Sequence, residues 1–294
     1  MIDSILYGDC RQTLNTLKSH ITTGICDKPR MCVTSPPYYG LRDYGGESSQ
    51  IGQEQSPEEY IQEMVKVLSK VKDCLADDGT LWLNIGDSYY NYRPGKGQAL
   101  VKQTVSNTKQ DLPDKCARRG NKLEGIKEKD LIGIPWMLAF ALRADGWYLR
   151  QDIIWNKSNP MPESVRDRCT KSHEYMFLLS KSQNYYFDVD VIKEPTRRKR
   201  SVWNVSTKPY KGSHFAVFPP ELITPCILAS SEENDIILDP FIGSGTTAMV
   251  AKELGRYYIG CELHEDYGNL IQERMGVSVD KVVHNGLTNA LRDV

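Results

Sequence analysis

A double proline directly after a short apolar run constrains this chain more than any other local feature. The run is Met31-Cys32-Val33, typical of a buried strand, and residues 34–38 (Thr-Ser-Pro-Pro-Tyr) follow it. Proline fixes φ and has no backbone N–H, so a strand cannot continue through residues 36–37. The chain must therefore turn at the carboxyl end of the strand, which is where open α/β sheets bind ligands.

This turn presents a hydroxyl group on Ser35, backbone carbonyls with no local amide partner, and the aromatic ring of Tyr38. Such a set suits an exocyclic amino group, because the oxygens can accept its hydrogens while the ring stacks on the base. Taken alone, an ordinary Pro-Pro turn with a packed tyrosine explains the segment equally well.

A second segment far downstream is typical of a nucleotide-cofactor site. Residues 234–239 predict an apolar strand, and a glycine turn and a helix over 248–254 follow it. The turn departs from the dinucleotide fingerprint, since Thr246-Thr247 follow Gly245 and the third glycine is absent. Glu262 ends the next apolar strand, where a carboxylate can hold two ribose hydroxyls. A tight turn followed by a surface glutamate is the alternative.

Together the two segments resemble the amino-methyltransferases of DNA, which methylate N4 of cytosine or N6 of adenine with S-adenosyl-L-methionine. Residues 34–38 look like the family's catalytic motif, 239–247 like its cofactor motif, and Glu262 like its ribose-binding acid. The catalytic motif comes first, as in the permuted beta group. The resemblance implies an α/β, Rossmann-like fold with a mostly parallel seven-stranded sheet, an antiparallel hairpin and a circularly permuted motif order.

The resemblance also implies which residues form the site. The catalytic group is the turn after the first apolar run: Ser35, Pro36, Pro37 and Tyr38. The cofactor-binding group is the glycine turn, its flanks and three residues from other segments: Asp9, Phe218, Asp239, Pro240, Phe241, Gly243, Ser244, Gly245, Thr246, Thr247 and Glu262. Asp9 belongs to a Gly-Asp pair that contacts the adenine end of the cofactor in the family, and it is equally placed to cap the following helix.

The implied reaction is direct methyl transfer to an exocyclic amino nitrogen, with S-adenosyl-L-homocysteine as the product. Acceptors at Ser35 and the Pro36 carbonyl would free the nitrogen lone pair, and Tyr38 would stack on a base flipped out of the duplex. Serine at position 35 favours N4 of cytosine in this family, and N6 of adenine is the alternative. Methylation of RNA or of a protein, and a silent nucleic-acid-binding module, are more remote.

Several other segments fit the scaffold of such a domain. Residues 56–59 form a capping box with proline at the first helical position, and they open a helix with apolar residues at helical spacing. Residues 80–86 predict a buried strand and 134–142 an apolar helix. The runs 147–155 and 174–179 look like the antiparallel pair that closes a methyltransferase sheet.

Charge is distributed unevenly along the chain. From Arg93 to Lys129 there are ten Lys or Arg against four acidic residues, a local charge of +6 in a chain of net charge −1. A cationic insertion beside a base pocket can supply phosphate contacts, and a solvated loop is the alternative. We therefore divide the chain into a catalytic half (1–88), a DNA target-recognition insertion (89–130) and the remainder with the cofactor motif (131–294).

Cysteine usage and apolar patterning limit the compartment and the cofactors. No apolar run approaches the roughly 20 residues of a membrane span, and the N-terminus lacks the pattern of a signal peptide. The eight cysteines show no zinc or disulfide spacing, and Cys226 fits a buried inert thiol. We expect a cytoplasmic protein of a bacterium, archaeon or phage, with no metal, that acts on duplex DNA. A cognate restriction endonuclease is a candidate partner, and the oligomeric state is open.

Overall fold

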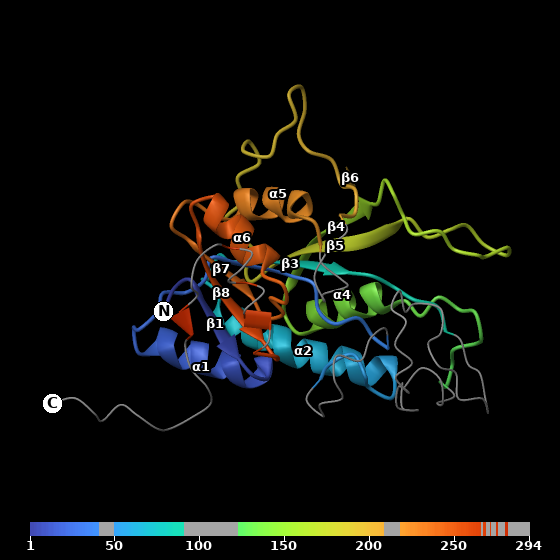
Figure 1. The fold of residues 1–294 in the computed structure, drawn as a ribbon, viewed down its shortest axis with the longest axis horizontal. Helices are drawn as coiled ribbons and strands as arrows, with labels where there is room; N and C mark the ends of the chain where they lie inside the picture. Colours follow the sequence, from blue (N-terminus) through green and yellow to red (C-terminus); the bar gives the residue numbers. More distant parts are fainter. Residues whose placement is uncertain are drawn as a thin grey trace.

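The computed structural model describes residues 1–40, 50–90, 123–208 and 218–265, with single positions at 267, 268, 271, 275, 280 and 281. Within these residues nine strands form one sheet in the order β6-β4-β5-β3-β2-β7-β8-β1-β9 (Figure 1). The strands are β1 (Ser4–Tyr7), β2 (Met31–Thr34), β3 (Thr80–Ile85), β4 (Tyr148–Asn156), β5 (His173–Ser180), β6 (Val202–Asn204), β7 (Ile236–Asp239), β8 (Tyr257–Glu262) and β9 (Asp280–Lys281).

The sheet confirms the predicted mostly parallel architecture with one antiparallel element. The seven predicted strands correspond to β1–β5, β7 and β8, and among them β5 runs antiparallel to both of its neighbours, β3 and β4. The sheet has two strands more than predicted, since β6 pairs with β4 at one edge and β9 with β1 at the other. Strands of three and two residues are too short to show an alternating pattern in the sequence.

Helices cover both faces of the sheet (Figure 1). They are α1 (Cys10–Thr22), α2 (Pro57–Cys74), α4 (Ile134–Ala144), α5 (Pro220–Ser230) and α6 (Thr246–Glu253). The first three pack on one face and the last two on the other. Buried strands therefore send alternate side chains into two separate cores: in β2, Cys32 enters the first core, and Met31 and Val33 enter the second.

The two sequence motifs come together because β2 and β7 are neighbours in the sheet. Cys32 pairs with Leu238, so the carboxyl ends of the two strands lie side by side. The helices that follow these strands, α2 and α6, lie on opposite faces of the sheet. Such a reversal is the point at which open α/β sheets bind ligands.

Local signals in the sequence set the helix boundaries as predicted. The Ser56 side chain accepts a hydrogen bond from the backbone N–H of Glu59 at 3.2 Å, and Pro57 occupies the first position of α2. Asp9 caps α1 by accepting from the N–H of Arg11. At the start of α4, the cap is supplied by Asp87 from the end of β3, which accepts from the N–H groups of Gly133 and Ile134.

Most of the basic insertion 89–130 lies outside the described residues, so its interpretation as a target-recognition region stays a prediction. The structure does describe Cys226, which is fully buried as predicted, and burial holds the pKa of its thiol well above the ordinary value. None of the described helices is long and apolar enough to cross a bilayer.

We predict that Leu68→Ala lowers the free energy of unfolding by about 2–5 kcal/mol, since Leu68 is fully buried between α2 and the sheet. Denaturant unfolding would measure this loss. Gln62→Ala is the matched control, because Gln62 is exposed on the same helix and its truncation should change stability by less than about 0.5 kcal/mol. Equal effects of the two substitutions would contradict this packing of α2.

Candidate active site

Polar groups from seven strands gather at one edge of the sheet. The strands β1, β2, β3, β4, β7 and β8 end there, and β5 begins there because it runs in the opposite direction. The predicted catalytic turn follows β2, the predicted cofactor turn follows β7, and Glu262 is the last residue of β8. The edge therefore holds both halves of the site that the sequence predicts.

A buried carboxylate links the two halves. Asp239 Oδ1 accepts from the Thr34 hydroxyl at 2.6 Å and from the backbone N–H of Phe241 at 3.0 Å. Its Oδ2 accepts from the Thr247 hydroxyl at 2.6 Å. Burial raises the pKa of Asp239 to about 6, and these hydrogen bonds oppose that rise. Asp239 thus joins the end of β2 to the glycine turn and to the first turn of α6.

The catalytic turn is held from behind by α2. The Tyr60 hydroxyl donates to the Pro37 carbonyl at 2.9 Å, and the Ser35 hydroxyl lies 3.4 Å from the Tyr38 hydroxyl oxygen. Among the described residues, no donor is within hydrogen-bond distance of the Pro36 carbonyl. The turn therefore keeps the acceptor at Pro36 that the sequence predicts for an amino group.

The hydroxyl end of Tyr38 enters a polar network that the sequence did not predict. It donates to Glu174 Oε2 at 2.7 Å and lies 3.3 Å from Asn84 Oδ1. The Asn84 amide in turn donates to Glu174 Oε2 at 3.2 Å, and Lys157 forms an ion pair with Glu174 Oε1. A buried asparagine inside the apolar strand β3 is the sequence signal that could have indicated this network.

The glycine turn after β7 brings backbone N–H groups to Glu262. Gly243 donates to Glu262 Oε2 at 3.0 Å, and His264 donates to Oε1 at 3.1 Å. Gly245 has φ +80°, and a Cβ there would stand 2.9 Å from the Ile271 side chain, so the position requires glycine. Burial raises the pKa of Glu262 to about 7, although these N–H groups act in the opposite direction.

Glu262 has the properties expected of a ribose-binding acid. Each carboxylate oxygen can accept a second hydrogen bond besides the one that it already receives, so two hydroxyl groups can be held. The residue is only 8% exposed, and unfavourable burial of its charge would be relieved by hydroxyl donors. The two acceptor oxygens of Glu262 therefore fit a nucleoside with two neighbouring hydroxyl groups, as the predicted cofactor has.

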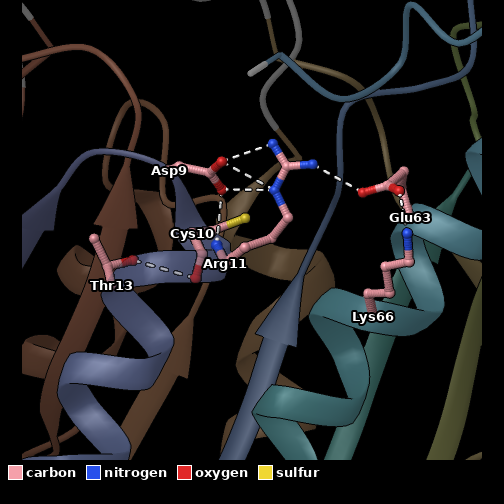
Figure 2. Close-up of polar contacts among 6 residues, drawn as sticks. All are labelled: Asp9, Cys10, Arg11, Thr13, Glu63 and Lys66. Carbon is pink, nitrogen blue, oxygen red and sulfur yellow. Dashed lines mark hydrogen bonds and ion pairs between the residues drawn. The ribbon is translucent and has the colours of Figure 1, made fainter. Parts of the chain in front are cut away.

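Asp9 lies at the end of β1, beside the end of β8, and the Gly8 N–H donates to the Glu262 carbonyl at 2.8 Å. Figure 2 shows that both Asp9 oxygens face the Arg11 guanidinium, whose Nη2 is 2.6 Å from Asp9 Oδ2. Arg11 Nη1 also pairs with Glu63 of α2 at 2.8 Å. Asp9 is thus both the helix cap and one end of an ion-pair network, and its contact with a cofactor stays a prediction.

The other predicted cofactor residues divide into two groups. Those of the turn itself lie at the same edge and are buried or half-buried: Pro240, Phe241, Gly243, Ser244, Gly245, Thr246 and Thr247. Phe218, by contrast, precedes α5 and is buried in the core that α5 and α6 cover. The structure joins the first group to Asp239 and Glu262, and nothing in it tests contact of either group with a cofactor.

No group of three or more His, Cys, Asp or Glu side chains that could hold a metal ion occurs in the described part of the chain. The arrangement instead combines a backbone-and-carboxylate cradle for a nucleoside with oxygen acceptors beside an aromatic ring. A Rossmann-like sheet with a cradle of this kind at its carboxyl edge is typical of α/β proteins that bind nucleotides.

Comparison with known proteins identifies the family. The family model described as DNA methylase, for the N6 and N4 enzymes, matches residues 30–273. The chain is 49% identical to type II methyltransferase M.SmaI of Serratia marcescens over 92% of its own length and 90% of the relative's. It is 50% identical to type II methyltransferase M.Cfr9I of Citrobacter freundii, over 92% and 87%. The chain belongs to the DNA amino-methyltransferases that methylate N4 of cytosine or N6 of adenine.

Solved structures agree with this fold. The PvuII DNA methyltransferase, named as cytosine-N4-specific, superposes with a TM-score of 0.64 at 18% identity, over 97% of this chain and 87% of the other. A putative DNA modification methylase from Thermus thermophilus, in complex with S-adenosyl-L-methionine, gives a TM-score of 0.60 at 22% identity over 94% of each chain. At these identities the likeness concerns the fold.

We predict that Thr34→Val destabilises the protein by about 1–3 kcal/mol, because the substitution removes a donor from the buried Asp239 carboxylate. Denaturant unfolding at neutral pH would measure the loss. Thr16→Val is the control: Thr16 is exposed, and its hydroxyl contacts only the carbonyl one helical turn earlier at 3.4 Å. If both variants were equally stable, Asp239 would not link the two halves of the site.

Proposed function

We propose that the chain transfers the methyl group of S-adenosyl-L-methionine to N4 of cytosine in duplex DNA. The observation that carries this proposal is the position of the Ser35–Tyr38 turn. Asp239 links Thr34, directly before this turn, to the glycine turn, which in turn donates to Glu262. The cytosine-N4 activity named for the PvuII enzyme supports the choice of base. So does the serine at position 35, in view of the family resemblance. N6 of adenine is the second candidate, since the matching family model covers both reactions.

Bound S-adenosyl-L-methionine supplies an electrophilic methyl group. Glu262 would hold its ribose hydroxyls, and the glycine turn would lie against the rest of the nucleoside. On the other side of Asp239, the Ser35 hydroxyl and the Pro36 carbonyl would accept the two hydrogens of the target amino group. Its lone pair is then directed out of the ring system and toward the methyl carbon. The nitrogen would form its bond to this carbon as the bond from carbon to sulfur breaks, which leaves S-adenosyl-L-homocysteine, and the cationic nitrogen would then release one proton to solvent. Alignment of the nitrogen accounts for most of the catalysis.

The target base has to leave the duplex to reach this edge, because its amino group is paired within the double helix. Tyr38 would stack on the extruded base. Basic side chains support contact with the DNA backbone. In the connection from β4 to β5 at this edge, Arg166 is exposed and the Arg168 guanidinium lies 3.8 Å from the centre of the Tyr89 ring. Arg198 and Arg200, which precede β6, are exposed as well. We also propose 89–130 as the target-recognition region, and a cognate restriction endonuclease as partner because the curated relatives are type II methyltransferases.

The test of the reaction is mass spectrometry of nucleosides from unmethylated random-sequence duplex DNA incubated with the protein and S-adenosyl-L-methionine. We expect N4-methylcytosine. N6-methyladenine would keep the mechanism and move the target base to the second candidate. If neither nucleoside formed, while single-stranded RNA became methylated, the assignment of DNA as substrate would be wrong.

We expect Ser35→Ala to lower the methylation rate on the order of a hundredfold, by loss of one preorganised contact to the amino group. The variant should bind S-adenosyl-L-methionine as tightly as the wild type does, because Ser35 lies on the catalytic side of Asp239. Calorimetry and single-turnover methylation measure the two effects separately. A variant with the full rate would refute the role of the hydroxyl.

We predict that cofactor binding strengthens about tenfold from pH 6 to pH 8 through Glu262. Its pKa of about 7 leaves much of the carboxyl protonated at pH 6, and the ionised form is the better acceptor for hydroxyl groups. Titration calorimetry with S-adenosyl-L-homocysteine at pH 6, 7 and 8 measures this dependence. Glu262→Gln is the matched control, and an identical pH dependence in that variant would contradict the assignment.

The raised pKa of Glu262 gives the stability of the cofactor-free protein a pH dependence opposite to that of cofactor binding. A carboxyl whose folded-state pKa is raised binds its proton more tightly when folded. The contribution of Glu262 to stability is therefore fully present below its ordinary value of 4.5 and is lost as the pH rises through about 7. Cofactor binding and intrinsic stability thus respond to pH in opposite directions at this residue.

A further inference from the structure

Tyr38 is fixed at both ends of its side chain. Its backbone belongs to the Pro-Pro turn that Tyr60 and Asp239 brace, and its hydroxyl donates to Glu174 Oε2 at 2.7 Å. A buried tyrosine hydroxyl needs a hydrogen-bond partner, and any acceptor would satisfy it. Here the partner is a carboxylate, which gives a stronger and more directional hydrogen bond than a neutral acceptor does and so fixes the tip of the ring.

Glu174 is itself held in place by neighbouring strands. Its side chain is 15% exposed, Lys157 at the end of β4 pairs with Oε1, and Asn84 of β3 donates to Oε2 at 3.2 Å. The Asn84 amide also donates to the Tyr175 carbonyl at 3.1 Å, which fixes its own orientation. The hydroxyl of Tyr38 is thus held by Glu174 of β5 and lies close to Asn84 of β3, and Lys157 holds Glu174 in turn. Its longer contact, at 3.4 Å, is with the Ser35 hydroxyl of the catalytic turn itself.

The ring of Tyr38 also lies close to the backbone of Gly86. A Cβ at Gly86, directly after β3, would lie 2.8 Å from Tyr38 Cε2 and 3.4 Å from Glu174 Cδ. Gly86 has no positive φ, so its backbone conformation does not require glycine. The lack of a side chain at this position instead allows the Tyr38 ring to come close to the backbone. The ring is therefore confined by Gly86 on one side and by its hydroxyl at the tip.

The protonation state fits this arrangement. Burial, and next the charge of Glu174, hold the pKa of the Tyr38 hydroxyl well above its ordinary value. The hydroxyl remains a donor at neutral pH, and Glu174 is its acceptor.

We propose that Glu174 is a positioning residue, which sets the plane of the Tyr38 ring on which the extruded base stacks. This inference rests on the proposed function, because it concerns the base pocket of that reaction. Alignment is the main source of rate in such a transfer, and small displacements of an aligned group cost rate steeply. Asn84, Lys157 and Gly86 act through Glu174 or the ring and do not touch the reacting atoms.

A double-mutant cycle tests the proposal. We expect Tyr38→Phe and Glu174→Ala each to lower kcat on the order of tenfold, with the KM for S-adenosyl-L-methionine unchanged. The double variant should be no worse than about twofold below the slower single variant, because each single variant already lacks the contact between Tyr38 and Glu174. Glu174→Gln keeps an acceptor oxygen and should recover part of the rate. If the two losses multiplied in the double variant, the proposal would be overturned.

The chain offers a matched control pair. The Tyr186 hydroxyl lies 3.4 Å from Glu232 Oε1 at the opposite edge of the sheet, near the start of β3. Glu232→Ala should leave kcat unchanged. A tenfold loss of kcat in this control would show that the assay responds to any lost tyrosine–glutamate contact, and the inference would fail.

Gly86→Ala provides a test that leaves every hydrogen-bonding group in place. The added methyl should displace the ring and lower kcat on the order of tenfold, without changing affinity for S-adenosyl-L-homocysteine. An unchanged kcat would contradict the confinement of the ring by Gly86.

The cycle of Tyr38→Phe and Glu174→Ala can also be measured in the free energy of unfolding, which requires no enzymatic activity. If the two substitutions were coupled in stability while the wild type did not methylate DNA, the proposed function would be rejected and the contact between Tyr38 and Glu174 would be retained. Additive unfolding energies would reject the anchor itself.

Discussion

The hydrogen bonds of one buried carboxylate hold this site together. Asp239 accepts from Thr34, Thr247 and the N–H of Phe241, and it thereby fixes three elements whose residues lie far apart in the chain. An acid at this depth is costly unless its oxygens are satisfied, and the rise of its pKa to about 6 shows that part of the cost remains. The pairing of β2 with β7 brings the turn after β2 next to the glycine turn, and Asp239 then links the two turns by side-chain hydrogen bonds.

Around Asp239 the edge of the sheet separates into two regions with different chemistry. On the side of β8 and β1, backbone N–H groups and the Glu262 carboxylate surround a space suited to a nucleoside. On the side of β3, β5 and β4, the Tyr38 hydroxyl donates to Glu174, and Lys157 and Asn84 hold that carboxylate in place. In the proposed reaction, a methyl group passes from the first region to the second. The common edge of the parallel strands makes the two regions neighbours.

Segments with a long apolar pattern, or with clear capping, proline or glycine signals at their ends, were predictable from sequence. The capping box at Ser56 and the apolar spacing after it gave α2 its start, and the strand–glycine–helix pattern located Asp239 and Glu262. The short edge strands β6 and β9 were missed, because two or three residues carry no periodicity. Glu174 was missed for another reason: next to His173 at the start of a strand it looks like any exposed acid, until the sheet places it against Tyr38.

By itself, the sequence determined which groups this protein has for its chemistry: a Pro-Pro turn that must stop a strand, glycines that permit a tight turn, and an acid after the following strand. These are local consequences of backbone sterics and residue type. The tertiary structure alone decided that the two motifs share an edge, that Thr34 and Thr247 satisfy one carboxylate, and that Glu174 anchors Tyr38. Such contacts depend on strand order and register, which non-local pairing sets and no short segment encodes.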